Sequence, residues 1–124
     1  MRRLLILFAL SGCAPQSQAP VSRDALAAEL AGRTAGAAQA CVSTTPNQNL
    51  RVVNSQTLAY EVGRTVWINR LKAACPALDP YNTVIVETSA DQYCRGDRVH
   101  GLEPGSSIAG PGCNLDDWTP YRLP

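Results

Sequence analysis

Five cysteines and one histidine are the residues of this 124-residue chain whose types are best suited to chemistry. Cys41, Cys75, Cys94 and Cys113 follow one another at intervals of 34, 19 and 19 positions. Structural zinc sites are usually built from pairs of Cys or His only a few residues apart. Neither these intervals nor the lone His100 supplies such a pair. The pattern therefore favours two disulfide bonds over a metal site, and it predicts no cofactor.

The fifth cysteine, Cys13, follows a stretch with the layout of an export signal. Met-Arg-Arg precedes seven apolar residues, LLILFAL, and then Ser11-Gly12, in the order of a charged start, an apolar centre and a small-residue end. The sequence LSGC resembles the bacterial lipoprotein signal, in which the thiol receives a diacylglycerol and the chain is cut before it. We therefore expect a signal peptide over 1–12 and a palmitate-bearing lipid at Cys13, with an unused cysteine in a cleaved signal as the competing interpretation.

The expected mature chain is held at a membrane by this lipid alone. Seven apolar residues are too few to span a bilayer, for which a helix needs about 20. Residues 13–21 contain two prolines and are expected to form a flexible tether. Because Ala14 replaces the aspartate that retains similar lipoproteins at the inner membrane, we expect the outer membrane of a Gram-negative cell envelope, facing the periplasm. Without residues 1–12, nine basic residues stand against ten acidic ones, which argues against a nucleic-acid partner.

Four cysteines allow three pairings. Cys75 and Cys94 flank the strand-like run TVIVET, whereas Cys41 and Cys113 lie near the beginning and the end of the expected domain. We therefore expect the pairs Cys75–Cys94 and Cys41–Cys113. Each bond would add about 2–4 kcal/mol to the stability of a small exported domain.

Catalytic chemistry finds little support in the sequence. His100 is the one candidate base, with Asp97 before it and Ser106 and Ser107 after it, but no nucleophile stands in a GxSxG context. Carboxylates are scattered, and Asp116-Asp117 lacks the alternating ligands of a calcium loop. We expect no enzyme and assign no catalytic residue.

Arg95-Gly96-Asp97 spells an adhesion tripeptide directly after a cysteine. Glycine supplies backbone freedom in a turn, and the flanking charged side chains can bond neighbouring backbone groups. We therefore interpret Arg95, Gly96 and Asp97 as a structural turn rather than an adhesion site.

A helical segment is expected over 22–40, before the domain proper. Ser22 is a good N-cap, and Leu26 and Leu30 share one face of a helix. Gly32 and Gly36 weaken the second half of this segment, so it is also open to partial disorder.

Residues 41–124 are expected to form a small β-rich, disulfide-linked domain, which makes the fold class α+β and mainly β. Five short runs rich in β-branched and aromatic residues predict an antiparallel sheet or barrel: RVVNS, TLAYEV, TVWINRL, TVIVET and RVHGLE. Gly63 predicts a two-residue hairpin turn that sets Tyr60 opposite Trp67 and Ala59 opposite Ile68. Both faces of this hairpin are partly apolar, so both should be covered. The Gly- and Pro-rich tail after 100 is expected to be a long loop.

A resemblance rests on Trp67-x-Asn69-x-Leu71, Cys75-Pro76-x-Leu78, Cys94-Arg95-Gly96-Asp97 and Cys113-x-Leu115. Together these resemble an uncharacterised family of small disulfide-containing envelope lipoproteins of Gram-negative bacteria, over roughly 41–121. Where similar proteins have Val-Val-Asp this chain has Val52-Val53-Asn54, and where they often have glycine it has Asp116. The resemblance implies a domain of unknown function and no activity.

Two classes of function agree with these features. The first is a lipid-anchored, non-enzymatic binding or structural module that contacts an envelope protein or a small ligand. The second is an inhibitor of a secreted hydrolase such as a lysozyme or a protease, because lipid-anchored β domains of this size include lysozyme inhibitors. Capture of partners from solubilised envelope would separate the two.

Overall fold

The computed structural model describes residues 12–13, 21–44, 49–88 and 90–124. The expected signal peptide lies outside the described residues except for Gly12, and the expected tether lies outside them except for its two ends, Cys13 and Val21. No helix in the described ranges is long and apolar enough to cross a membrane.

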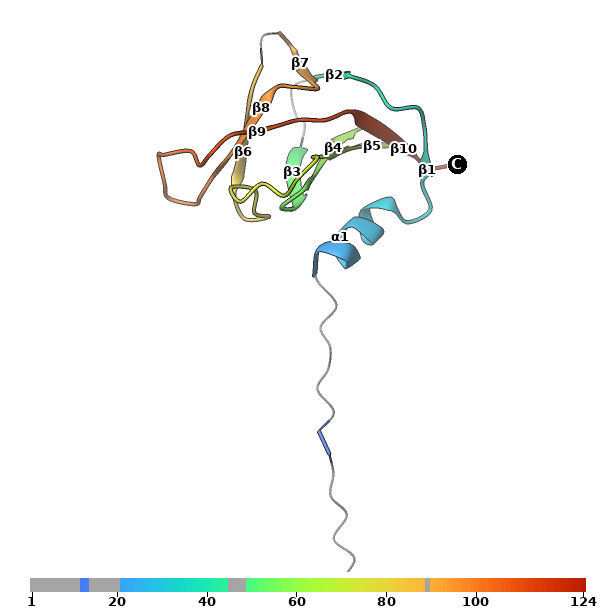
Figure 1. Cartoon of the computed structure of the whole chain (residues 1–124). Coiled ribbons are helices and arrows are strands. Elements are labelled where there is room, and N and C mark those ends of the chain that lie inside the picture. The colour runs from blue at the N-terminus through green and yellow to red at the C-terminus, as the bar shows by residue number, and fades with distance from the viewer. Residues whose placement is uncertain (1–11, 14–20, 45–48, 89) are drawn as a thin grey trace, which may run out of the picture.

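One helix and ten strands make up the described fold (Figure 1), which is mainly β as expected. The chain order is α1 (Val21–Leu30), β1 (Thr34–Ala35), β2 (Cys41–Ser43), β3 (Asn49–Asn54), β4 (Thr57–Val62), β5 (Thr65–Arg70), β6 (Thr83–Glu87), β7 (Gln92–Cys94), β8 (Arg98–Leu102), β9 (Cys113–Asn114) and β10 (Trp118–Arg122). The main sheet has the order β1-β10-β5-β4-β3, and two smaller sheets pair β2 with β7 and order β6-β8-β9. All strand pairs are antiparallel. The main sheet is open rather than closed into a barrel.

The five predicted strands are all present, as β3, β4, β5, β6 and β8. The register of the central hairpin is also confirmed, with Tyr60 opposite Trp67 and Ala59 opposite Ile68. Gly63 has φ 58° in the connecting turn, a backbone conformation that glycine adopts without steric cost. Local sequence therefore determines this hairpin.

Both faces of the main sheet are covered. On one face the largest buried side chains include Leu58, Tyr60 and Trp118, which form the principal core with residues of the two smaller sheets. On the other face a smaller cluster of Val53, Ala59, Val66 and Ile68 contacts Ala25, Leu26 and Leu30 of α1. Because successive residues of a strand point to opposite faces, the hairpin contributes to both clusters.

A salt bridge fastens α1 to the sheet. Arg51 of β3 donates two hydrogen bonds to the carboxylate of Glu29, one of them at 3.1 Å. The guanidinium of Arg51 also lies 3.7 Å from the carboxylate of Glu61 on β4. The helix is thus held over the second face by polar as well as apolar contacts.

The predicted helix over 22–40 is wrong in its second half. The helix ends at Leu30, and the chain then forms β1 beside β10. Gly36 donates a backbone hydrogen bond to Pro120 at 2.7 Å, and a Cβ at this position would lie 3.0 Å from the Pro120 ring. The segment after Leu30 has a weak propensity for helix, so its pairing with the distant strand β10 determines its conformation.

The predicted long loop at the C-terminus is also wrong, because it contains β9 and β10. Pro120 argues against a central strand, yet β10 lies between β1 and β5. The carbonyl of Pro120 faces Gly36 on the β1 side, and in an antiparallel strand the N–H of the same residue points to that side too. The absence of an N–H on Pro120 therefore removes no hydrogen bond from the ladder between β10 and β5.

Two disulfide bonds are present as expected, but the expected pairs are wrong. Cys41 is bonded to Cys94, and Cys75 to Cys113. Cys41 and Cys94 are direct partners in the β2–β7 ladder, with Cα atoms 4.0 Å apart. Cys113 on β9 lies beside β8 and meets Cys75 in the segment after β5, with a Cα separation of 6.1 Å.

Candidate functional site

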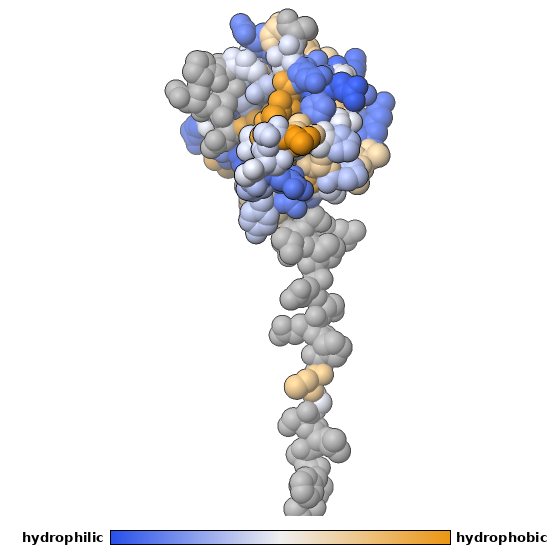
Figure 2. Space-filling view, turned by 90° about the vertical axis from the view of Figure 1, so that its left-hand side faces the viewer, coloured by the Kyte–Doolittle hydropathy of each residue, from blue (hydrophilic) through white to orange (hydrophobic). Residues whose placement is uncertain are grey.

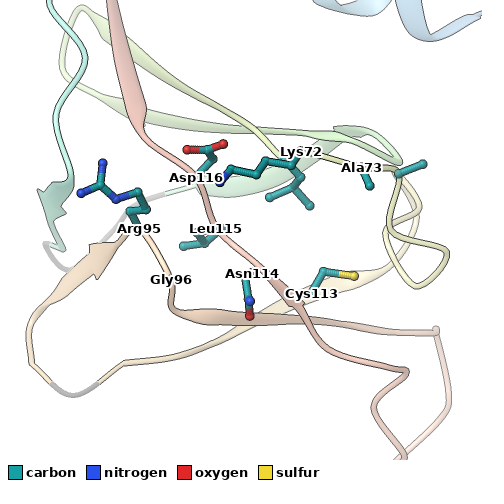
Figure 3. Close-up of a pocket in the computed structure, with 10 residues that line it drawn as sticks. Lys72, Ala73, Arg95, Gly96, Cys113, Asn114, Leu115 and Asp116 are labelled. Atoms are coloured by element: carbon teal, nitrogen blue, oxygen red, sulfur yellow. The ribbon is translucent and has the colours of Figure 1, made fainter.

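A groove of about 370 Å³ lies where the segment after β5 approaches the segment between β9 and β10. One wall is formed by 71–74 and the other by 113–116, while Arg95 and Gly96 close one end (Figure 3). Leu71 and Leu115 are buried and form an apolar floor together with Cys113 of the disulfide. The volume is at the lower end of the range for small-molecule sites.

Asn69 holds the second wall in place. Its side-chain amide donates to the carbonyl of Asp116 at 2.6 Å, and its side-chain oxygen accepts from the Asp116 amide at 2.9 Å. Asn69 is fully buried on β5, so both of its polar groups are satisfied by one backbone unit 47 positions away. This clamp and the Cys75–Cys113 bond fix the distance between the two walls.

The Arg95-Gly96-Asp97 turn forms the end of the groove. Asp97 accepts a hydrogen bond from the Cys94 amide at 2.8 Å. The backbone of the turn bonds Leu115 twice, with Gly96 donating and Asp97 accepting, each at 2.9 Å. These contacts agree with a structural turn for Asp97, whereas Arg95 points its guanidinium to Asp117 at 2.8 Å on the surface.

Charged side chains lie along the rim of the groove. Arg95 and Lys72 are exposed, and Figure 3 shows the Lys72 side chain extended toward Asp116. Asp116 accepts a hydrogen bond from the Asp117 amide at 2.8 Å. Within the described ranges Lys72 forms no ion pair. The residues lining the groove therefore carry two cations and one carboxylate. Of the two cations, Lys72 is the one whose ammonium contacts no carboxylate within the described ranges.

The Lys72, Ala73 and Ala74 amides add further donors to the first wall. Leu71 donates to Gln56 and Cys75 donates to Ser55, but the three amides between them make no hydrogen bond within the described part of the chain. All three residues are exposed. This wall therefore offers solvated backbone donors as well as the lysine.

His100 lies away from the groove. Its Nδ1 is 3.0 Å from the Gly110 carbonyl and its Nε2 is 3.1 Å from the Glu87 carboxylate. Ser106 bonds the backbone of Ile108 instead of the imidazole. The structure therefore places the histidine in contacts that fasten the loop after β8, and it does not bring the serine to it.

A second hollow, of about 410 Å³, is lined by that loop together with Pro76, Ala77 and Asn82. Figure 2 views the molecule from the side that carries β6 and this loop, and it shows a small hydrophobic patch bordered by hydrophilic residues. Tyr81 and Ile108 are the most exposed large apolar residues of the described chain. The hollow contains a single charged residue, Glu103, so it offers less specific recognition than the groove.

Tyr60 and Trp67, the expected hairpin core, belong to the packing of the sheet. Tyr60 is fully buried, meets Tyr93 and Trp118 edge to face, and donates to the Ser43 carbonyl at 3.1 Å. Trp67 is partly buried, and the central carbon of the Arg122 guanidinium lies over its indole, 6.0 Å from the ring centroid. Neither residue lines the groove.

Of the residues predicted from the sequence, Arg95 and Gly96 line the groove, whereas the roles of Lys72 and Asn69 were not predicted. Asn69 had a signal, because an asparagine within the apolar strand TVWINR must find partners for both its polar groups. For Lys72 the sequence contained no signal of a role, other than that it is the only lysine in the chain. No cluster of metal-ligating side chains exists among the described residues.

The chain matches no known protein family, no curated protein and no solved structure.

Proposed function

We propose that this protein is a lipid-anchored, non-enzymatic binding module of the bacterial cell envelope, and that the groove between 71–74 and 113–116 is its ligand site. The resemblance to an uncharacterised lipoprotein family stays a prediction and specifies no ligand. The groove is the observation that carries it, because it combines a buried apolar floor with charged groups on a rigidly held rim.

The state of the cysteines supports the anchor. Four of them are consumed in two disulfides, a chemistry typical of exported proteins. Cys13 is the one free and exposed cysteine, and it stands at the position that the leader sequence predicts for lipidation. A thiol reserved for attachment of the diacylglycerol would account for the odd number of cysteines.

The composition of the groove supports binding rather than catalysis. Its lining residues in the described chain include no serine, threonine or histidine, and the cysteine among them is disulfide-bonded. Catalysis by a serine, threonine or cysteine nucleophile needs such a group beside a base. The side chains present suit recognition by charge and apolar contact.

Lipidation is tested by metabolic labelling with palmitate. Cys13→Ser should lose both the label and partitioning into detergent, whereas the control Ser11→Ala keeps a small residue before the cysteine and should retain both. Unchanged membrane association of Cys13→Ser would refute the anchor.

The groove is tested by capture from solubilised envelope. Ala73→Trp places a large ring in the groove, and Ala28→Trp introduces the same ring on the exposed face of α1. A partner that wild type and Ala28→Trp recover, and Ala73→Trp does not, would support the proposal. Recovery that is insensitive to Ala73→Trp would refute the groove as the site, and groove-dependent recovery of a lysozyme or protease would favour the inhibitor alternative.

A further inference from the structure

We propose that the groove recognises the free carboxylate end of a peptide whose last residue has an apolar side chain. This inference rests on the proposed function and names the ligand of the same site. Its chemistry follows from three features of the groove that lie close together: an unpaired ammonium, a carboxylate held in a fixed position, and an apolar floor.

The ammonium of Lys72 selects an anion. It extends over the groove (Figure 3) without an ion-pair partner in the part of the chain that the structure describes. Arg95 at the end of the groove spends one donor on Asp117, and a guanidinium has five N–H donors in all. The lining residues thus carry two positive charges and one negative charge, and Asp117 outside the lining pairs with Arg95. The amides of 72–74, which make no hydrogen bond within the described chain, add neutral donors of the kind that bind carboxylates in backbone nests.

Asp116 restricts which anion is accepted. The Asp116 carboxylate accepts a hydrogen bond from the Asp117 amide. The Asp116 backbone makes two hydrogen bonds with the Asn69 side chain, so the position of the carboxylate is fixed. A phosphate or sulfate with several charged oxygens would be repelled by this group. A peptide terminus places an N–H on the same residue as its carboxylate, so that the N–H can donate to Asp116 while the carboxylate meets Lys72.

The apolar floor of the groove is the reason for proposing an apolar side chain on the last residue of the peptide. Leu71 and Leu115 are each only 3% exposed, and Ala73 and Ala74 contribute methyl groups to the same wall. A volume of about 370 Å³ admits the last two or three residues of a peptide rather than a folded surface. The bound segment would therefore be a chain end.

The test measures binding of two peptides to the full mature protein in detergent. Each peptide has the sequence Ala-Ala-Leu with a neutral fluorophore at its N-terminus, and one ends in a free carboxylate whereas the other ends in a carboxamide. Fluorescence polarisation, with unlabelled peptide as competitor, gives both dissociation constants. We expect the acid to bind at least about tenfold more tightly than the amide, which is the effect of one charge-assisted hydrogen bond.

Lys72→Met identifies the group responsible, because it removes the charge and keeps the apolar stem. This variant should bind acid and amide with similar dissociation constants, while its affinity for the amide stays at the wild-type value. The control Arg64→Met removes an exposed cation from the β4–β5 turn and should keep the tenfold preference.

Equal binding of acid and amide by wild type would overturn the inference, as would a preference that survives in Lys72→Met or no binding at millimolar peptide. If both peptides bind equally and Ala73→Trp abolishes both, the groove remains a ligand site and only the carboxylate is wrong. If neither peptide binds, the capture experiment alone decides the proposed function.

Discussion

Asn69→Asp tests whether the buried amide holds the second wall of the groove. The substitution conserves shape and replaces the side-chain NH2 with an oxygen. Because that NH2 donates to the Asp116 carbonyl at 2.6 Å, the new oxygen would face another oxygen at hydrogen-bond distance. The other contact, from the Asp116 amide to Oδ1, would persist.

The expected loss of unfolding free energy is about 3–5 kcal/mol at pH 7, the usual cost of an uncompensated buried charge. The site is fully buried, so solvent relieves little of this cost. A domain of this size has about 5–15 kcal/mol in total. The variant should therefore fold, but only marginally.

The loss should shrink in acid. Burial beside a carbonyl oxygen would hold the pKa of the introduced carboxyl in the folded protein above its value in the unfolded chain, about 3.9. Below that pH the carboxyl is neutral in both states and can donate to the Asp116 carbonyl, so the cost is small. Above it the unfolded state ionises first, and the cost grows by about 1.4 kcal/mol per pH unit. A cost of about 4 kcal/mol is thus reached near pH 7.

Denaturant unfolding at several pH values measures this difference against wild type at each pH. Asn114→Asp is the matched control, because Asn114 is exposed and its side chain makes no hydrogen bond within the described ranges. It should change stability by less than about 0.5 kcal/mol. Equal losses for the two variants at pH 7, or a loss for Asn69→Asp that does not diminish in acid, would refute the clamp.

Two further predictions concern the turn and the disulfides. Asp97→Ala should cost about 1–2 kcal/mol, because it removes the acceptor for the Cys94 amide, whereas exposed Asp91→Ala should cost less than about 0.5 kcal/mol; equal melting of the two variants would refute the structural role. Replacing Cys41 and Cys94 together by serine should cost about 4 kcal/mol, from loop closure over 53 residues, and thiol titration of the lipidated protein should find no reactive thiol, because Cys75 and Cys113 stay bonded. Two free thiols would show that Cys41 and Cys94 are not bonded to each other.

Local signals were sufficient for five of the ten described strands and for one register. Alternating β-branched and aromatic residues around Gly63 determine the β4–β5 hairpin, and its partners Tyr60 and Trp67 are placed as predicted. The same local reasoning failed for β1 and β10, which form only through each other and through β5. Their residues have weak propensities, so a tertiary contact decides their conformation.

The disulfide pairing could not be predicted from local sequence either, because it too depends on contacts between segments that are distant in sequence. The expected pairing rested on Cys75 and Cys94 flanking the strand TVIVET and on Cys41 and Cys113 lying near the two ends of the domain. In the structure, Cys94 lies on β7 opposite Cys41 of β2, and the position of β2 depends on how the chain passes the edge of the main sheet. A pairing between strands this far apart in sequence requires knowledge of the whole topology.

Folding and recognition are separable in the groove. The walls are joined by the Cys75–Cys113 bond and by the Asn69 clamp, both of which involve buried groups whose loss is costly. Lys72 is exposed and makes no ion pair within the described chain, so the fold does not depend on its charge. Lys72→Met should therefore unfold at the wild-type denaturant concentration while it loses the preference for a carboxylate. A variant with lower stability would mean that the lysine supports the wall, and its effect on binding would then be indirect.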